Sequence, residues 1–253
     1  MHKILSIVIL ILFIASTSQV IAQKKSVKKD WEIEAVPYLW YAGLDGTLTK
    51  YDGTAYPFEA SFSDVFKNLD FAFMFEVSAK YKKLCFSTDF NYIKLSRENQ
   101  PAPVGYPYLT TDLQHTETDY EFTAGYTTEL KKLELKFMGG AKIVSVSTKL
   151  DAYNNSTLFK SGTIEETIVD PIITADAKYG ISKGFYGAIH LGYGGFGVNS
   201  ERIIDSKIMF QKYFSQMFSV RLGYRYLYTK IKKDTYATDI SKGGFVMGFG
   251  FNF

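Results

Sequence analysis

Cysteine and histidine are scarce in this chain, with one cysteine and three histidines among 253 residues. The single Cys85 excludes an intrachain disulfide framework. The scarcity of both side chains leaves no cluster of the kind that binds zinc. Asp45-Gly46 and Asp52-Gly53 fit turn pairs, and the ligand spacing of an EF-hand is missing. We therefore expect no metal ion and no cofactor.

Long apolar runs are confined to the N-terminus. Basic His2-Lys3 precedes an almost unbroken apolar run over residues 4–14, and Val20-Ile21-Ala22 is a plausible small-residue cleavage site. Export and the small net charge of +3 argue against a nucleic-acid partner. The chain is expected to divide into a signal peptide, a flexible periplasmic leader and one folded domain, over residues 1–22, 23–30 and 31–253.

Aromatic residues make up 17% of the chain, yet its mean hydropathy is only −0.07. The last eleven residues show how the two values coexist, because side chains on a strand alternate between its faces. One face of this segment carries Phe245, Met247, Phe249, Phe251 and Phe253, and the other carries Gly244, Val246, Gly248, Gly250 and Asn252. A strand with one face towards lipid and one towards a lumen has this pattern.

Similar alternation recurs along the chain in about ten segments. They lie near residues 31–42, 70–81, 84–96, 116–130, 133–148, 163–181, 185–198, 202–213, 217–231 and 243–253. Short links alternate with long ones, as in outer-membrane barrels. The sequence therefore predicts an all-β fold, an antiparallel transmembrane β-barrel of about ten strands, with eight or twelve as alternatives. A soluble sandwich or lipocalin-like barrel would also alternate but would hide its aromatic face inside.

Three segments together resemble a known family. They are Trp31–Trp40 with Gly43 and Gly46, then Phe62–Phe71, and Gly194–Val198 followed by Gly223–Tyr226. In this order they resemble the small, largely uncharacterised, porin-like β-barrel proteins of the bacterial outer membrane. A last strand that ends on Phe253 is similar to the assembly signal of such barrels. The resemblance implies a Gram-negative outer membrane, contact with its lipid, and barrel assembly machinery that would read Phe249, Phe251 and Phe253.

Charged residues on the polar strand faces would point into a narrow barrel, where buried charges need partners. The two histidines after the predicted leader, His115 and His190, lack a neighbouring serine in a His-X-Ser pattern, and no omptin-like Asp-His spacing is present. His190 is expected to face the lumen and bond a neighbouring carboxylate. We therefore expect no catalytic residue and no enzyme. Instead we predict a lumen charge network that includes Glu76, Lys80, Asp119, Glu121, Asp176, His190, Arg221 and Arg225.

Two shorter features concern loops and bends. Residues 61–69 have helical apolar spacing, with Ser63 as a candidate N-cap, and could form either a lid in the barrel mouth or a surface helix. The glycines over 192–197 are not followed by a helix, so close packing or a strand bend is favoured over phosphate binding.

Three functions remain open from the sequence. The first is a narrow channel or transport barrel for a small solute. The second is a closed structural or interaction barrel that binds a surface partner or lipid through its loops. The third is an outer-membrane enzyme. A ten-stranded barrel is intermediate in width, so its size does not choose between an open and a filled lumen.

Overall fold

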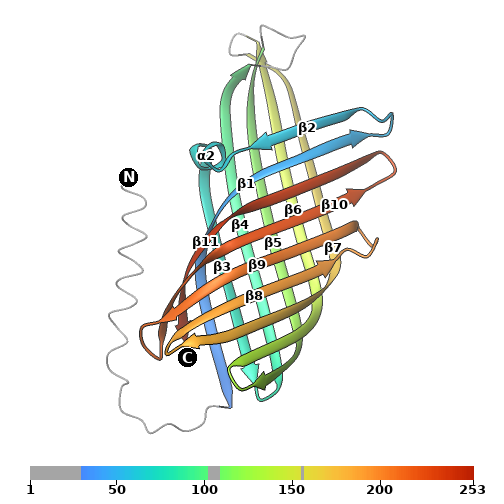
Figure 1. Cartoon of the computed structure of the whole chain (residues 1–253). Coiled ribbons are helices and arrows are strands. Elements are labelled where there is room, and N and C mark those ends of the chain that lie inside the picture. The colour runs from blue at the N-terminus through green and yellow to red at the C-terminus, as the bar shows by residue number, and fades with distance from the viewer. Residues whose placement is uncertain (1–29, 102–108, 155–156) are drawn as a thin grey trace. The chain divides into compact units, whose positions relative to one another are not determined.

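The computed structural model describes residues 30–101, 109–154 and 157–253, so the predicted signal peptide and nearly all of the leader lie outside the described residues. The described part is almost entirely strand (Figure 1). Its strands are β1 Trp31–Lys50, β2 Ala55–Ala60, β3 Leu69–Tyr81, β4 Leu84–Pro101, β5 Leu109–Leu130, β6 Leu133–Asn154, β7 Thr157–Ser182, β8 Phe185–Gly194, β9 Ser200–Tyr213, β10 Phe218–Lys232 and β11 Tyr236–Asn252. Every pairing between them is antiparallel.

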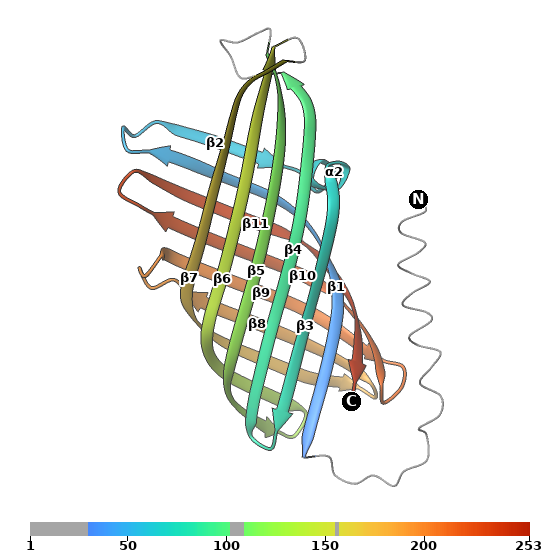
Figure 2. The same ribbon diagram turned by 180° about the vertical axis from the view of Figure 1, so that it is seen from behind.

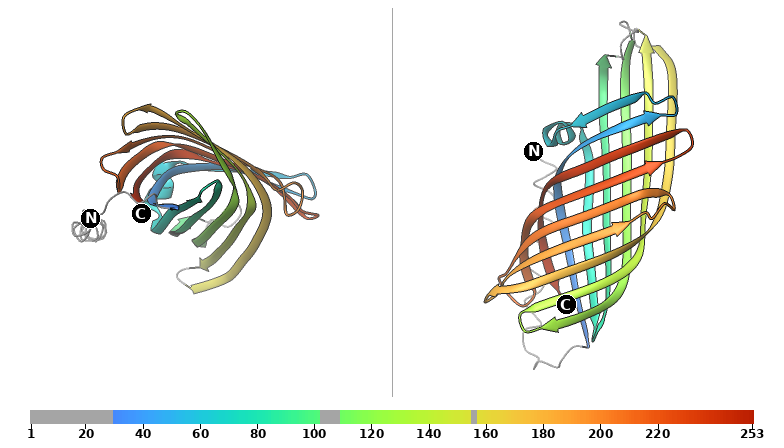
Figure 3. Two further views of the ribbon diagram at one scale, coloured as in Figure 1. Left: turned by 90° about the horizontal axis from the view of Figure 1, so that it is seen from below. Right: turned by 45° about the vertical axis from the view of Figure 1, so that its right-hand side comes forward.

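The sheet closes into a ring because β1 pairs with both β3 and the last strand, β11. β2 pairs only with the second half of β1, so the described residues form a ring of ten strands plus one attached strand. The strands are tilted, so in a side view the strands of the wall β8–β11 run at an angle to those of the opposite wall β3–β7 (Figure 3). The predicted antiparallel barrel is confirmed. The region 43–69, predicted as one long connection, instead contains the end of β1, β2 and a short helix.

Outward-facing side chains form an apolar band around the ring. Phe73, Phe122, Phe137, Ile173 and Leu222 are each about half exposed, although a soluble protein would bury such residues. Towards one end of the barrel the band gives way to polar side chains. On β7 the change falls between Val169 and Thr167, and on β6 it falls between their partners Ile143 and Ser145. A lipid-facing barrel has this surface.

Glycines let neighbouring strand backbones approach closely, and two of them show the tightest approach. A Cβ atom at Gly140 would lie 1.8 Å from the carbonyl oxygen of Phe122 on β5, and one at Gly244 would lie 1.9 Å from that of Tyr41 on β1. Only glycine tolerates so close an approach of neighbouring backbones. Between β8 and β9, Gly195 and Gly197 adopt positive φ angles of 88° and 76°, which build the tight turn there. A strand bend was predicted over residues 192–197. The structure keeps residues 192–194 in β8 and places Gly195 and Gly197 in the turn that follows it.

Beyond the apolar band the ring separates into two wings. The tall wing consists of the ends of β4–β7, which rise past the other strands (Figure 2). The short wing consists of β2 with the adjoining ends of β1, β11 and β10. Links predicted as long loops over 97–114 and 150–162 are therefore mostly strand where they are described. We call this the wing end of the barrel. The opposite end, with the tight turns at Lys82-Lys83 and Lys131-Lys132, is the turn end.

The predicted helix is present as α2, Phe62–Lys67. Its N-cap is Ser61 rather than Ser63, and Ser61 and Asp64 form a reciprocal capping box. The hydrogen bonds from Ser61 lower the pKa of the Asp64 carboxyl. Phe62 packs 5.1 Å from Tyr41, an outward-facing residue, so α2 lies on the outside of the wall and is not a lid. No described helix is long and apolar enough to span a membrane.

Candidate functional site

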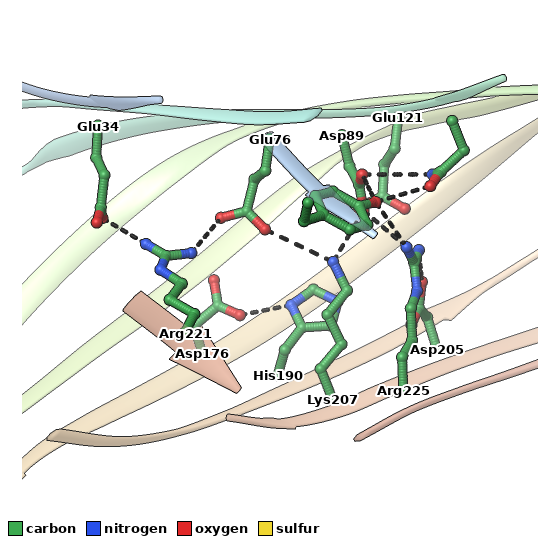
Figure 4. Close-up of polar contacts among 12 residues, drawn as sticks. Glu34, Glu76, Asp89, Glu121, Asp176, His190, Asp205, Lys207, Arg221 and Arg225 are labelled. Carbon is green, nitrogen blue, oxygen red and sulfur yellow. Dashed lines mark hydrogen bonds and ion pairs between the residues drawn. The ribbon is translucent and has the colours of Figure 1, made fainter. Parts of the chain in front are cut away.

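Four charged side chains meet in the middle of the lumen (Figure 4). Arg225 of β10 donates to both carboxylate oxygens of Asp205 on β9, at 2.6 and 3.2 Å. Its other terminal nitrogen lies 3.1 Å from Asp89 of β4, and Lys207 of β9 lies 2.8 Å from the same carboxylate. The side chains of Arg225 and Asp205 are 1% and 0% exposed. We call Asp89, Asp205, Lys207 and Arg225 the central cluster.

The bond between Lys207 and Asp89 spans the full width of the ring. From β9 to β4 the ring passes over β10, β11, β1 and β3 in one direction and over β8, β7, β6 and β5 in the other. Four strands intervene either way, so the two residues project from diametrically opposite walls. A direct ion pair between opposite walls therefore divides the lumen at this level. Side chains commonly fill the interior of narrow barrels.

Two neighbouring aromatic residues complete the central cluster. The hydroxyl of Tyr38 donates to Asp89 and also lies 2.8 Å from the side-chain oxygen of Asn91. The guanidinium of Arg225 lies 4.8 Å from the centre of the Trp40 ring, a distance at which a cation and an aromatic face attract. Removing one partner from such a buried arrangement leaves another charge without compensation, which is the costly way to break it.

Further ion pairs lie in the lumen on both sides of the central cluster. Towards the turn end, Arg221 of β10 lies 3.2 Å from Glu76 of β3 and also bonds Glu34 of β1, so it joins strands that are close together in the ring. Towards the wing end, Lys242 of β11 bonds Glu117 of β5, with three strands between them in the ring. Ion pairs therefore lie at three successive levels of the lumen.

A last bridge joins the two wings themselves. The Tyr236 hydroxyl of β11 donates to Glu166 of β7 at 2.6 Å, and Lys233 lies 3.9 Å from the same carboxylate. This contact links the short wing to the tall wing above the apolar band.

The predicted lumen residues fall into separate groups. Glu76, Arg221 and Arg225 belong to the bridges already described, and Glu121 lies 3.5 Å from Lys142 on the neighbouring strand. Lys80 lies apart at the turn end, where it bonds Glu129 and lies 3.8 Å from Glu134. Asp119 is buried, and its Oδ1 has no hydrogen-bond partner among the described residues.

The remaining predicted pair is Asp176 with His190. Nδ1 of His190 lies 2.5 Å from Oδ1 of Asp176 on the adjacent strand. Nε2 of the same ring has no hydrogen-bond partner within the described ranges. Asp176 orients the ring, but among the described residues no hydroxyl or thiol bonds Nε2, where a base would activate it. His115 lies towards the wing end, 2.9 Å from the Thr148 hydroxyl and away from this pair.

Two cavities lie on the turn side of the central cluster. The inner one has a volume of about 130 Å³ and reaches from His190 and Arg221 to Asp89 and Lys207. The other, of about 570 Å³, opens at the turn end beside Lys80. Lys178 lines both and donates to the Tyr213 hydroxyl at 3.0 Å. The inner cavity reaches the central cluster at Asp89 and Lys207. No group of three or more metal-ligating side chains occurs in the part of the chain that the structure describes.

Sequence reasoning missed Asp89, Asp205 and Lys207, which are three of the four residues in the central cluster. Asp205 and Lys207 lie on β9, which had the weakest alternation, because its outward face includes Ser206 and Lys212 beside apolar residues. The signal available was the spacing of Asp205 and Lys207 two residues apart, which places both on one face.

Known structures place this architecture among bacterial outer-membrane proteins. The outer-membrane protease OmpT of Escherichia coli matches with a TM-score of 0.54 at 7% identity, over 91% of this chain and 99% of that one. The attachment invasion locus protein Ail of Yersinia pestis matches with a TM-score of 0.35 at 12% identity, over 88% and 98% of the two chains.

The toluene transporter TodX of Pseudomonas putida matches with a TM-score of 0.34 at 9% identity, over 88% of each chain. No family model and no curated protein matches the sequence. The fold and the exposed apolar band together support the outer-membrane location expected from the sequence. The chain has the fold of a bacterial outer-membrane β-barrel.

Proposed function

We propose that this protein is a closed outer-membrane barrel that acts through the wings it holds outside the membrane, as an interaction protein. The turn end faces the periplasm and the wing end faces the exterior, as is usual for barrels with short turns on one side. The observation that carries the proposal is the Lys207–Asp89 ion pair between opposite walls. A narrow solute channel, the first hypothesis from the sequence, would need a passage at this level.

An enzymatic role has less support. The Asp176–His190 pair lies in an internal cavity whose described lining offers the histidine no hydroxyl partner. A protease would also need this site to reach a polypeptide, but bridges lie between the inner cavity and the wing end. OmpT is a protease by name, and at 7% identity its likeness extends to the fold alone.

Single-channel recording of the refolded protein in a planar bilayer tests the proposal. We expect no discrete conductance, with heat-modifiable gel mobility as the check that the barrel is folded. The double variant Asp89→Ala/Lys207→Ala is the matched control, because it removes the wall-to-wall pair while leaving Arg225 bonded to Asp205. Conductance in the double variant, with none in the unmodified protein, would support the closed barrel. Reproducible steps in the unmodified protein, altered by Arg221→Gln, would overturn it in favour of a channel.

A further inference from the structure

The outer part of β7 is a strand edge with no neighbour. β7 pairs with β8 only from Ile172 onwards, whereas it pairs with β6 from Thr157 to Tyr179. The turn between β8 and β9 covers the start of this edge, since Gly195 donates to the carbonyl of Pro171 and the Asn199 side chain donates to that of Val169. Beyond that point, over residues 160–168, no described strand adjoins β7 on this side.

The backbone groups along this edge can be assigned by alternation. The carbonyls of Pro171 and Val169 point away from β6, towards the turn that binds them. In an antiparallel strand the N–H and C=O of one residue point to the same side, and the side alternates along the chain. The N–H and C=O groups of Thr167, Glu165 and Thr163 therefore face the open side. All three residues lie outside the apolar band.

An open edge of this kind is a template for another strand. The residues over 160–168 include neither proline nor a run of like-charged lysines. Lys160, Glu165 and Glu166 are charged, Ile164 is 73% exposed, and Gly162 has no heavy atom within 4 Å of its Cβ position. Glu166 is turned inwards to Tyr236.

The strand that fits this edge is the same strand of a second molecule. Two identical antiparallel strands in one sheet are related by a twofold axis perpendicular to the sheet. This rotation leaves each side chain on the same face of the sheet in both copies. Because side chains alternate between the faces, residues that face each other must both have odd numbers or both have even numbers. With Thr163 on the axis, Lys160 faces Glu166 of the second copy and Glu165 faces Ser161. No like charges face each other in this register, and the opposite charges attract. An axis through Glu165 would set two carboxylates against each other.

The same axis fixes where the second molecule must be. The tall wing continues the barrel wall, so the membrane normal lies in the plane of its sheet. Rotation by half a turn about an axis perpendicular to that sheet reverses the normal. The two barrels therefore belong to two membranes that face each other, and copies within one membrane cannot pair in this way.

We propose that the β7 edge over residues 160–168 joins two copies of this protein in apposed outer membranes by antiparallel strand pairing. The inference rests on the proposed function, since it names the partner of the wings. Each contact is short, but many copies on each surface act together, so two membranes can adhere through contacts that are individually weak.

Cysteine cross-linking between two vesicle populations tests the register. Refolded Glu165→Cys protein is placed in one population and Ser161→Cys protein in the other, and the two are mixed under mild oxidation. The native Cys85 is buried and should not react. We expect a heterodimer after mixing, because these positions face each other. Mixing Glu165→Cys vesicles with a second population of the same variant is the matched control, and it should give little dimer.

A backbone variant gives an independent readout. Thr163→Pro removes the edge N–H at the axis in both copies, whereas Thr163→Ala keeps it. The loss of two hydrogen bonds should lower the vesicle adhesion constant about tenfold for the proline variant, with the alanine variant close to the unmodified protein.

Three outcomes would overturn the inference: folded cysteine variants that give no heterodimer, equal dimer from every pairing, or equal adhesion of the proline and alanine variants. Should Thr163→Pro fail to fold, the cross-linking result decides alone. Neither experiment depends on conductance, so the proposed closed lumen stands or falls separately.

Discussion

The lumen and the tall wing use the same strands in opposite ways. Inside the membrane band, β7 carries Asp176 against His190 and shares both of its edges with neighbours. Outside the band, residues 157–165 of the same strand are exposed throughout, and one edge is open. The strand needs both neighbours only where lipid surrounds it, since an unpaired backbone is costly in hydrocarbon and cheap in water. Where partners are not required, the strand is available for binding.

The largest expected difference in unfolding free energy between the two regions comes from removing one charged side chain in each. Arg225→Ala leaves Asp89 and Asp205 near each other with only Lys207 to compensate, and should lower the free energy of unfolding by about 3–5 kcal/mol. Lys160→Ala in the tall wing should change it by less than about 0.5 kcal/mol. Urea titration of both variants in the same lipid vesicles measures the difference. Equal stabilities would mean that the central cluster is solvated and not structurally closed.

A smaller contrast is expected from adding a methyl group to glycine. Gly140→Ala would force the β5 and β6 backbones apart and should cost about 1–3 kcal/mol of unfolding free energy. Gly139→Ala is the matched control, because its nearest heavy atom is 3.9 Å away. In the wing, Gly162→Ala meets nothing within 4 Å and should be neutral or slightly stabilising. A fully tolerated Gly140→Ala would show that the two backbones do not approach so closely there.

The contact between the wings should have a more modest effect. Tyr236→Phe removes the hydroxyl that reaches Glu166 and should cost about 1 kcal/mol, since the net value of a hydrogen bond is small. Amide hydrogen exchange should accelerate over residues 157–168 of β7, while the strand segments within the apolar band keep their protection. Unchanged exchange in the wing would show that the wings do not depend on this contact.

The smallest expected effect concerns α2, which lies on the outer face of the wall beside β1 and β2. Ser61→Ala removes the cap and should cost about 0.5 kcal/mol of local stability in so short a helix. Because the bonds with Ser61 lower the pKa of Asp64, the carboxylate stabilises α2 at neutral pH. This contribution is lost as the pH falls below about 4, through the lowered pKa. Exchange rates of the α2 amides at neutral and acid pH measure it, and Ser61→Ala should abolish the pH dependence.

The barrel could be predicted from the sequence because lipid imposes a strict period on the outward face. The alternation of Phe71, Phe73 and Phe75 in β3 locates that strand without any knowledge of its partners. Strand ends outside the band were harder to predict. Water accepts backbone groups that lipid does not, so neither the continuation of β1 to Lys50 nor the hairpin with β2 leaves an alternating signal.

The candidate site could be predicted only in part. Faces can be read from the sequence, which is how Arg221 and Arg225 were assigned to the lumen. Partners across the ring depend on register and strand tilt, so the bond between Lys207 and Asp89 could not be inferred. The role of Phe249, Phe251 and Phe253 as an assembly signal stays a prediction.

The seam of the ring lies between the first strand and the last. β1 and β11 pair from Glu34 with Asn252 to Lys50 with Tyr236, so the contact joins residues from the two extremes of the domain. Contacts between such distant residues form slowly, because a long loop must close before they are made. Until β11 is in place, the facing edges of β1 and β10 have no partner at this seam. Hydrocarbon does not tolerate such open edges, so we expect closure of the seam to accompany membrane insertion.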